Sequence, residues 1–87
     1  MKKIELYFLI DCPHCQKAFG LLKDALIAEP KYKSLRFELI EEELSPALAE
    51  ERDYYYVPCF FLDGKKVHEG KITERDINKI LKDAYKE

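Results

Sequence analysis

The sequence has no long apolar run. The apolar stretch nearest its N-terminus covers only residues 6–10 and is preceded by Glu5. A secretory signal needs roughly 7–15 apolar residues followed by a small-residue cleavage site, and a membrane-spanning helix needs about 20 apolar residues. We therefore expect neither, and we expect the protein to work in the cytoplasm without a membrane partner.

The sequence also lacks a surplus of basic residues. Lys and Arg number 15 against 17 Asp and Glu, which gives a formal net charge of -2 over 87 residues. Without a basic stripe, a nucleic-acid partner is not expected. One short run of a single sign, Glu41, Glu42 and Glu43, predicts a solvated loop. The length suits one domain over residues 1–87, with no repeat or linker, and we expect a monomer.

Cysteines are few and their number is odd: the chain has only Cys12, Cys15 and Cys59. An odd number argues against a framework of disulfides, and a reducing cytoplasm disfavours a lasting structural disulfide. The sequence also lacks the second Cys or His pair of a closed four-ligand zinc site, because His14 and His68 stand alone. We therefore predict no metal and no other cofactor. A metal-binding or metal-delivery module built on these cysteines stays open as an alternative function.

Apolar periodicity predicts an α/β domain in the order β-α-β-α-β-β-α. The first strand is almost continuously apolar, which is typical of a central strand covered on both faces. Pro13 begins the first helix, Pro30 closes it, and Thr73 caps the last one. Asp63 and Gly64 predict a tight turn between the last two strands. The predicted strands cover residues 4–10, 35–39, 59–62 and 66–69, and the predicted helices cover residues 13–29, 47–53 and 73 onward.

Three of these elements carry a pattern that predicts one buried face. Apolar residues recur at helical spacing in two helices. In the second strand they alternate with polar residues, which predicts a half-buried or edge strand. The predicted buried residues are Cys15, Phe19, Leu22 and Leu26 in the first helix, Leu35, Phe37 and Leu39 in the second strand, and Ile77, Ile80, Leu81 and Ala84 in the last helix.

Cys12 and Cys15 flank Pro13 and His14 where the first strand ends and the first helix begins. In open α/β sheets, reactive groups collect at the carboxyl ends of strands. Cys12 stands at the helix cap, where amide hydrogens and the helix dipole favour a thiolate; protonated His14 adds to this effect and Asp11 opposes it. Cys15 lies one turn further, near enough for a disulfide to form and open. We interpret the pair as a redox device in which Cys12 attacks and the buried Cys15 resolves.

Other residues have an ordinary explanation beside a functional one. Cys59 is expected to be a small buried hydrophobic residue, although it could face the active site. Tyr54, Tyr55 and Tyr56 could form a wall that faces the substrate. Packing accounts for at least one of them, since alternate strand residues point inward. His68 is expected on the surface.

The strand, the Cys-Pro-His-Cys motif, the Val57–Pro58 pair before a hairpin and the closing helix together resemble the thioredoxin superfamily, in particular its small glutaredoxin-like branch. The resemblance covers essentially the whole chain and implies a four-stranded mixed sheet with helices on both faces. It implies a cis bond before Pro58, next to the cysteines, and a substrate contact made by Val57, Pro58 and Tyr56. It also implies a thiol-disulfide oxidoreductase with catalytic Cys12 and Cys15.

The chain departs from that family at the positions that hold glutathione. The Lys that usually precedes the cysteine pair is replaced by Ile10 and Asp11, the Gly-Gly stretch before the last helix is reduced to Gly70, and Tyr56 replaces a Thr. Thioredoxins proper usually have a Trp before the pair, and this chain has none. We therefore expect protein disulfides as substrates, a dithiol or a reductase as electron donor, and no dedicated glutathione site. The Cys-Pro-His-Cys motif also occurs in larger exported disulfide oxidases, so the motif alone does not set the direction of the reaction.

Overall fold

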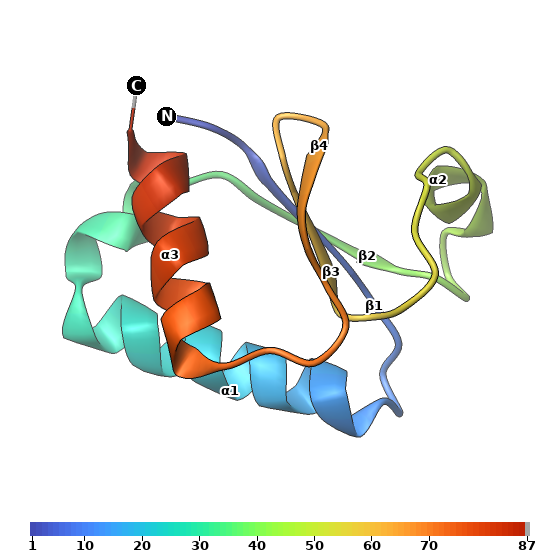
Figure 1. The fold of residues 1–87 in the computed structure, drawn as a ribbon, viewed down its shortest axis with the longest axis horizontal. Helices are drawn as coiled ribbons and strands as arrows, with labels where there is room; N and C mark the ends of the chain where they lie inside the picture. Colours follow the sequence, from blue (N-terminus) through green and yellow to red (C-terminus); the bar gives the residue numbers. More distant parts are fainter. Residues whose placement is uncertain (87) are drawn as a thin grey trace.

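The computed structural model describes residues 1–86. Its strands form one mixed sheet in the order β2-β1-β3-β4 (Figure 1). β1 pairs parallel with β2 and antiparallel with β3, and β3 pairs antiparallel with β4. These pairings confirm the predicted α/β architecture, with two parallel strands followed by a hairpin. The strands are β1 (Ile4–Phe8), β2 (Phe37–Glu41), β3 (Cys59–Leu62) and β4 (Lys65–Glu69).

Helices cover both faces of the sheet, as predicted. α1 (Pro13–Ala28) and α3 (Glu74–Tyr85) pack on one face, and α2 (Pro46–Glu50) lies on the other (Figure 1). α1 carries the chain from β1 back to β2, which is the crossover that two parallel strands require. Within residues 1–86, none of the helices has the length and apolar character that crossing a bilayer requires.

Alternation along the strands divides the buried side chains between two clusters. In β1, Leu6 faces α1 and α3 while Tyr7 faces α2, so a continuous apolar run is needed to fill both sides. The smaller cluster, on the α2 side, consists of Tyr7, Ile40, Cys59 and Phe61. The larger cluster consists of Ile4, Leu6, Ala18, Leu22, Leu35, Phe60, Leu62, Ile72, Ile77, Ile80, Leu81 and Ala84.

The predicted helix and hairpin ends have the expected local geometry. Pro13 occupies the first turn of α1, where its missing N–H leaves no hydrogen bond unmade. At the start of α3, the Thr73 hydroxyl accepts from the Asp76 N–H, and the Asp76 carboxylate accepts from the Thr73 N–H, which completes a capping box. Asp63 and Gly64 have φ values of 47° and 84°, as a tight two-residue hairpin turn requires.

Two connections differ from the prediction. A 3₁₀ helix (η1, Pro30–Ser34) follows α1, although the sequence pattern indicated no helix there. α2 was predicted to cover residues 47–53, and it ends at Glu50. It stops because the N–H groups of Glu51 and Arg52 bond to carbonyls three residues back, and the Arg52 side chain reaches Glu5 and Tyr7 on the sheet.

β2 buries a different set of side chains from the one predicted. The alternation of Leu35, Phe37 and Leu39 predicted a half-buried or edge strand, and β2 is an edge strand. Of these three residues, only Leu35, just before the strand, is buried. Phe37 is half-buried and Leu39 is 52 % exposed, whereas Ile40 and Glu41 are buried. The reason is the place of β2 at the edge of the sheet, where the helices leave part of its face uncovered.

Candidate functional site

The cysteine pair lies where β1 passes into α1. Cys12 is the N-cap residue of α1, with extended backbone angles, and its carbonyl accepts the first helical hydrogen bond from the Gln16 N–H at 3.0 Å. The Gln16 side-chain amide reaches back to the Ile10 carbonyl at 3.2 Å, and the Cys12 N–H donates to the Leu9 carbonyl at 3.2 Å. These bonds fix the turn that presents the first cysteine.

The two cysteines differ sharply in burial. Cys12 is partly exposed, whereas Cys15 is 1 % exposed and packs on the inner face of α1 beside Ala18 and Leu22. Burial raises the pKa of the Cys15 thiol to about 12. The pair therefore combines one accessible sulfur with one shielded sulfur a helical turn away.

The predicted capping contact at Cys12 is not the one observed. Its sulfur makes no hydrogen bond to the amides of the first turn of α1. Instead, the Cys12 thiol donates to the Val57 carbonyl, with 3.9 Å between Sγ and O. The sulfur is thus held toward the chain segment that enters β3.

Pro58 stands beside the cysteine pair, as predicted. The Val57–Pro58 peptide bond is cis, and Pro58 is fully buried. The antiparallel register pairs Tyr7 with Cys59, so the start of β3 lies next to the end of β1. Strand pairing therefore brings together two motifs that are more than forty residues apart in the sequence.

A carboxylate that the sequence did not single out holds the segment before Pro58. Glu69, at the end of β4, accepts hydrogen bonds from the backbone N–H groups of Tyr55 and Tyr56. It also forms an ion pair with Lys66, with 2.8 Å between Lys66 Nζ and Glu69 Oε1. These groups, Lys66 foremost, lower the pKa of the Glu69 carboxyl to about 2. No local pattern marks Glu69, because its amide partners lie 13 and 14 residues away.

A second carboxylate, that of Glu41, holds the loop before Cys12. The prediction that the whole glutamate run is solvated is therefore wrong for Glu41. Glu41 is 8 % exposed, and its oxygens accept hydrogen bonds from the N–H groups of Ile10, Glu43 and Leu44. Glu41 and Glu43 also line a hollow of about 310 Å³ that reaches Cys12. Since Glu41 ends β2, its position depends on the parallel pairing with β1.

Of the three consecutive tyrosines, one is packed in the protein and two are exposed, which agrees with the expectation that packing accounts for at least one. Tyr54 packs against Tyr7 and Phe61, and its hydroxyl donates to Glu42 at 2.6 Å. Burial and this hydrogen bond raise the pKa of the Tyr54 hydroxyl. Tyr55 and Tyr56 are 85 % and 70 % exposed, just before the half-buried Val57. Packing therefore accounts for one tyrosine and leaves two beside the site.

The remaining candidates are the third cysteine and the two histidines. Cys59 is fully buried on the α2 side of the sheet, where burial raises the pKa of its thiol to about 12. His68 is half-buried, and its ring nitrogen lies 2.7 Å from the Lys71 carbonyl oxygen. His14 is exposed in the first turn of α1, and its effect on the Cys12 thiolate stays a prediction. Within residues 1–86, no three His, Cys, Asp or Glu side chains are grouped to hold a metal ion.

Solved structures with the same fold include proteins of thiol metabolism. A chain from the structural study of thiol resolution in yeast mitochondrial 1-Cys peroxiredoxin by the glutathione/thioredoxin systems superposes with a TM-score of 0.72 at 22 % identity, over 94 % of this chain and 77 % of that one. Oxidised thioredoxin from Plasmodium falciparum also superposes with a TM-score of 0.72, at 13 % identity, over 94 % of this chain and 79 % of that one. At such identities the likeness shows the fold alone.

Sequence comparison is more specific. A search of curated protein sequences finds no match to this chain. The family model described as the thioredoxin domain, however, matches residues 2–82, which is nearly the whole chain and includes both cysteines of the motif, Pro58 and all four strands. The chain therefore belongs to the thioredoxin domain family.

Proposed function

We propose that this protein is a dithiol thiol-disulfide oxidoreductase that reduces disulfides in other proteins. A thiol redox function is what the thioredoxin fold suggests. The observation that carries the finer proposal is the pairing of a partly exposed Cys12 with a buried Cys15 one turn along α1, next to the Val57 carbonyl. Thiol-disulfide exchange needs an accessible attacking thiolate and a second thiol that only the first can reach.

The first step is attack by the Cys12 thiolate on one sulfur of a substrate disulfide. A bond forms between the Cys12 Sγ and that sulfur, the substrate S–S bond breaks, and the other substrate sulfur leaves as a thiolate. The product is a mixed disulfide between Cys12 and the substrate. The Val57 carbonyl no longer receives the Cys12 S–H at this stage and is free to accept from the substrate backbone.

The second step is attack by Cys15 on the Cys12 sulfur. Because burial holds the pKa of the Cys15 thiol near 12, the proton of Cys15 has to leave as the sulfur attacks. The substrate thiolate released in the first step is a base that can take it. The Cys12–Cys15 disulfide forms as the mixed disulfide breaks, and the second substrate sulfur leaves as a thiolate that takes a proton from solvent. Two electrons have then passed from the cysteine pair to the substrate.

The segment around Val57 is the proposed contact for the substrate chain. The Val57 carbonyl contacts Cys12, Pro58 and Tyr56 flank Val57 in the chain, and Tyr56 offers an exposed aromatic ring. An extended peptide around the substrate cysteine can pair with the Val57 backbone as a strand pairs with a sheet edge. The hydrogen bonds from Tyr55 and Tyr56 to Glu69 keep this segment in place before the substrate arrives.

We further propose that the enzyme acts as a cytoplasmic monomer and is regenerated by a dithiol or a reductase. The absence of a Lys before the motif supports this assignment of the donor. The positions that would hold glutathione carry Ile10, Asp11 and the single Gly70. Glutathione is therefore expected to reduce the Cys12–Cys15 disulfide poorly in comparison with a dithiol.

Turnover of a protein disulfide by cysteine variants tests the proposal. With a dithiol as donor, the native protein should reduce the substrate catalytically, and Cys12→Ser should be inactive. Cys15→Ser should stop after one attack and accumulate a mixed disulfide on Cys12, visible by mass under non-reducing conditions. Cys59→Ala is the matched control and should keep full activity, because Cys59 lies in the buried cluster under α2.

The same experiment separates the redox proposal from the metal-carrier alternative. A carrier binds one metal ion per protein and turns over no disulfide. Stoichiometric zinc binding that needs Cys12 and Cys15, together with no turnover by the native protein, would overturn the redox assignment. The equilibrium potential of the pair then fixes the direction, since about 30 mV corresponds to a tenfold change in the exchange equilibrium.

A further inference from the structure

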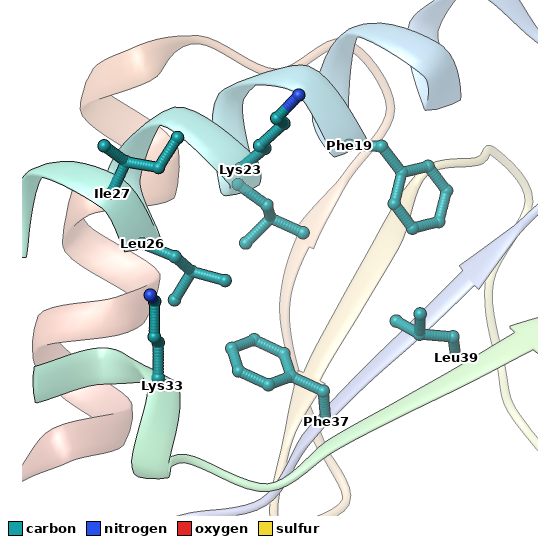
Figure 2. A pocket seen from close by; sticks show the side chains of 8 residues that line it. Phe19, Lys23, Leu26, Ile27, Lys33, Phe37 and Leu39 are labelled. Carbon is teal, nitrogen blue, oxygen red and sulfur yellow. The ribbon is translucent and has the colours of Figure 1, made fainter. Parts of the chain in front are cut away.

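An open apolar groove lies between α1 and the edge strand β2. On α1 it runs from Phe19 to Ile27, which is the part of the helix farther from the cysteine motif. Its volume is about 510 Å³, and Figure 2 shows its side chains converging from α1 above and β2 below. The apolar lining consists of Phe19, Leu22, Leu26, Ile27, Phe37 and Leu39. Cys12, Val57 and Pro58 do not line it, so it is distinct from the redox site.

The groove exists because β2 is the last strand on its side of the sheet. α1 buries Ala18 and Leu22 in the main core, and on the β2 side the groove is lined by Phe37 and Leu39. Leu39 and Ile27 are 52 % and 63 % exposed, so apolar side chains from both walls face solvent together. Scattered exposed apolar residues are normal, but a concave set of this kind is typical of a ligand site.

Positive charge marks the rim of the groove. Lys33, from η1, and Lys23, which extends outward from the α1 wall, both line the groove (Figure 2). Among the described residues 1–86, the acidic side chains that form ion pairs engage other partners: Lys3, Arg52, Lys66, Lys79 and Lys86. Among residues 1–86, Lys23 and Lys33 thus form no ion pair, and no acidic residue lines the groove.

We propose that this groove binds a single-chain amphiphile with an anionic head group, of the kind represented by a fatty acid. The alkyl chain lies against Leu26, Phe37 and Leu39, and the carboxylate lies at the Lys33 ammonium group. The groove volume falls in the range of about 300–1,000 Å³ that is usual for small-molecule sites. The polar groups stand only at the rim, which is the distribution that an amphiphile requires.

A second copy of the chain fits this surface less well. A two-fold symmetric contact brings the same patch of both subunits together, so the lysines at each rim would approach lysines of like charge. A free amphiphile meets no such repulsion, and it brings the opposite charge. The charge pattern therefore favours an anionic ligand over self-association.

Calorimetric titration with dodecanoate below its micellar concentration tests the proposal. We expect saturable binding of one molecule per chain, and binding of dodecyltrimethylammonium, which has the same alkyl chain and the opposite charge, at least several-fold weaker. Lys33→Gln should weaken dodecanoate binding about two- to fivefold, since the charge pair is exposed. Leu39→Ser should weaken both ligands about tenfold, through the lost apolar contact.

Matched controls come from the opposite edge of the sheet. Val67→Ser and Lys65→Gln change an exposed apolar residue and a lysine on β4, away from the groove, and should leave dodecanoate binding unchanged. Cys12→Ser should also bind normally, which separates this site from the redox proposal. All these side chains except Cys12 are exposed, so the variants should fold like the native protein.

Several results would overturn the proposal. Equal binding of the anionic and cationic ligands would remove the role of Lys33, and dodecanoate binding that survives Leu39→Ser would place the ligand elsewhere. Binding only to vesicles of anionic phospholipid, with no binding of monomeric dodecanoate, would assign the surface to a membrane. Binding of an acidic amphipathic helical peptide in place of dodecanoate would assign it to a protein partner.

Discussion

Selective alkylation of Cys12 is the most direct prediction from the geometry of the cysteine pair. Burial raises the pKa of Cys15 to about 12, against 9.0 for an ordinary cysteine thiol. Three pKa units correspond to about a thousandfold smaller thiolate fraction at neutral pH, and the thiolate is the reactive form. Cys59 has the same raised pKa, and Cys15 and Cys59 are 1 % and 0 % exposed. In the reduced protein, iodoacetamide should therefore modify Cys12 and spare the other two.

The assay is timed alkylation near neutral pH, followed by digestion with trypsin and mass spectrometry. Cys12 and Cys15 fall on one peptide, residues 4–17, so fragment ions between the two positions have to assign the label. Cys59 falls on another peptide, residues 53–65, and serves as the internal reference for a buried thiol. Alkylation in denaturant should remove the difference among the three cysteines.

The outcome can refute the reasoning in two ways. If Cys15 reacts as fast as Cys12, the shielding of Cys15 on the inner face of α1 is wrong, and so are the proposed roles of attacker and resolver. If Cys59 reacts within a factor of a few of Cys12, β3 opens readily and burial does not control the thiol chemistry here. A much slower reaction of both buried thiols than of Cys12 agrees with the burial argument.

Three further predictions concern stability and the electron donor. The folded-state pKa of Glu69 is about 2, below its usual 4.5. The stabilisation from this carboxylate is therefore complete above about pH 4.5 and is lost as the pH falls toward 2. Glu69→Gln should flatten that part of the pH profile of the free energy of unfolding, measured by urea denaturation. Arg52→Met leaves the buried Glu5 with only Lys3, at 3.7 Å, and should lower the free energy of unfolding by about 1–3 kcal/mol, since Arg52 itself is about a third exposed. The double variant Glu5→Leu with Arg52→Met should recover most of this loss, and an additive loss would contradict the ion-pair explanation. Glutathione should reduce the oxidised protein far more slowly than a dithiol at equal thiol concentration. A micromolar glutathione affinity, measured by titration, would show that the missing Lys and Gly-Gly stretch do not predict the electron donor.

Local sequence signals predicted most of the fold. The apolar run of β1, the prolines at the two ends of α1, the Asp63-Gly64 turn and the Thr73 cap each act within a few residues, and each forms as expected. The cis bond before Pro58 was predicted from family resemblance rather than from such a signal. Where tertiary contacts compete with local preference, the prediction failed: α2 ends early as Arg52 turns to the sheet, and β2 buries Ile40 in place of Leu39.

For the candidate site, too, local sequence predicted one part and tertiary structure decided the other. The sequence alone predicted which residues carry the proposed chemistry, because a cysteine at a helix cap and another one turn later are a matter of spacing along one helix. Only the tertiary structure decided what surrounds them. Glu69 and Glu41 secure the loops on either side of Cys12 through amides 13 to 31 residues away, and β2 lies at the edge of the sheet, which leaves the groove against α1 open. Such contacts depend on the order in which strands pair, and strand order is set by how the whole chain buries its apolar surface rather than by any short stretch of it.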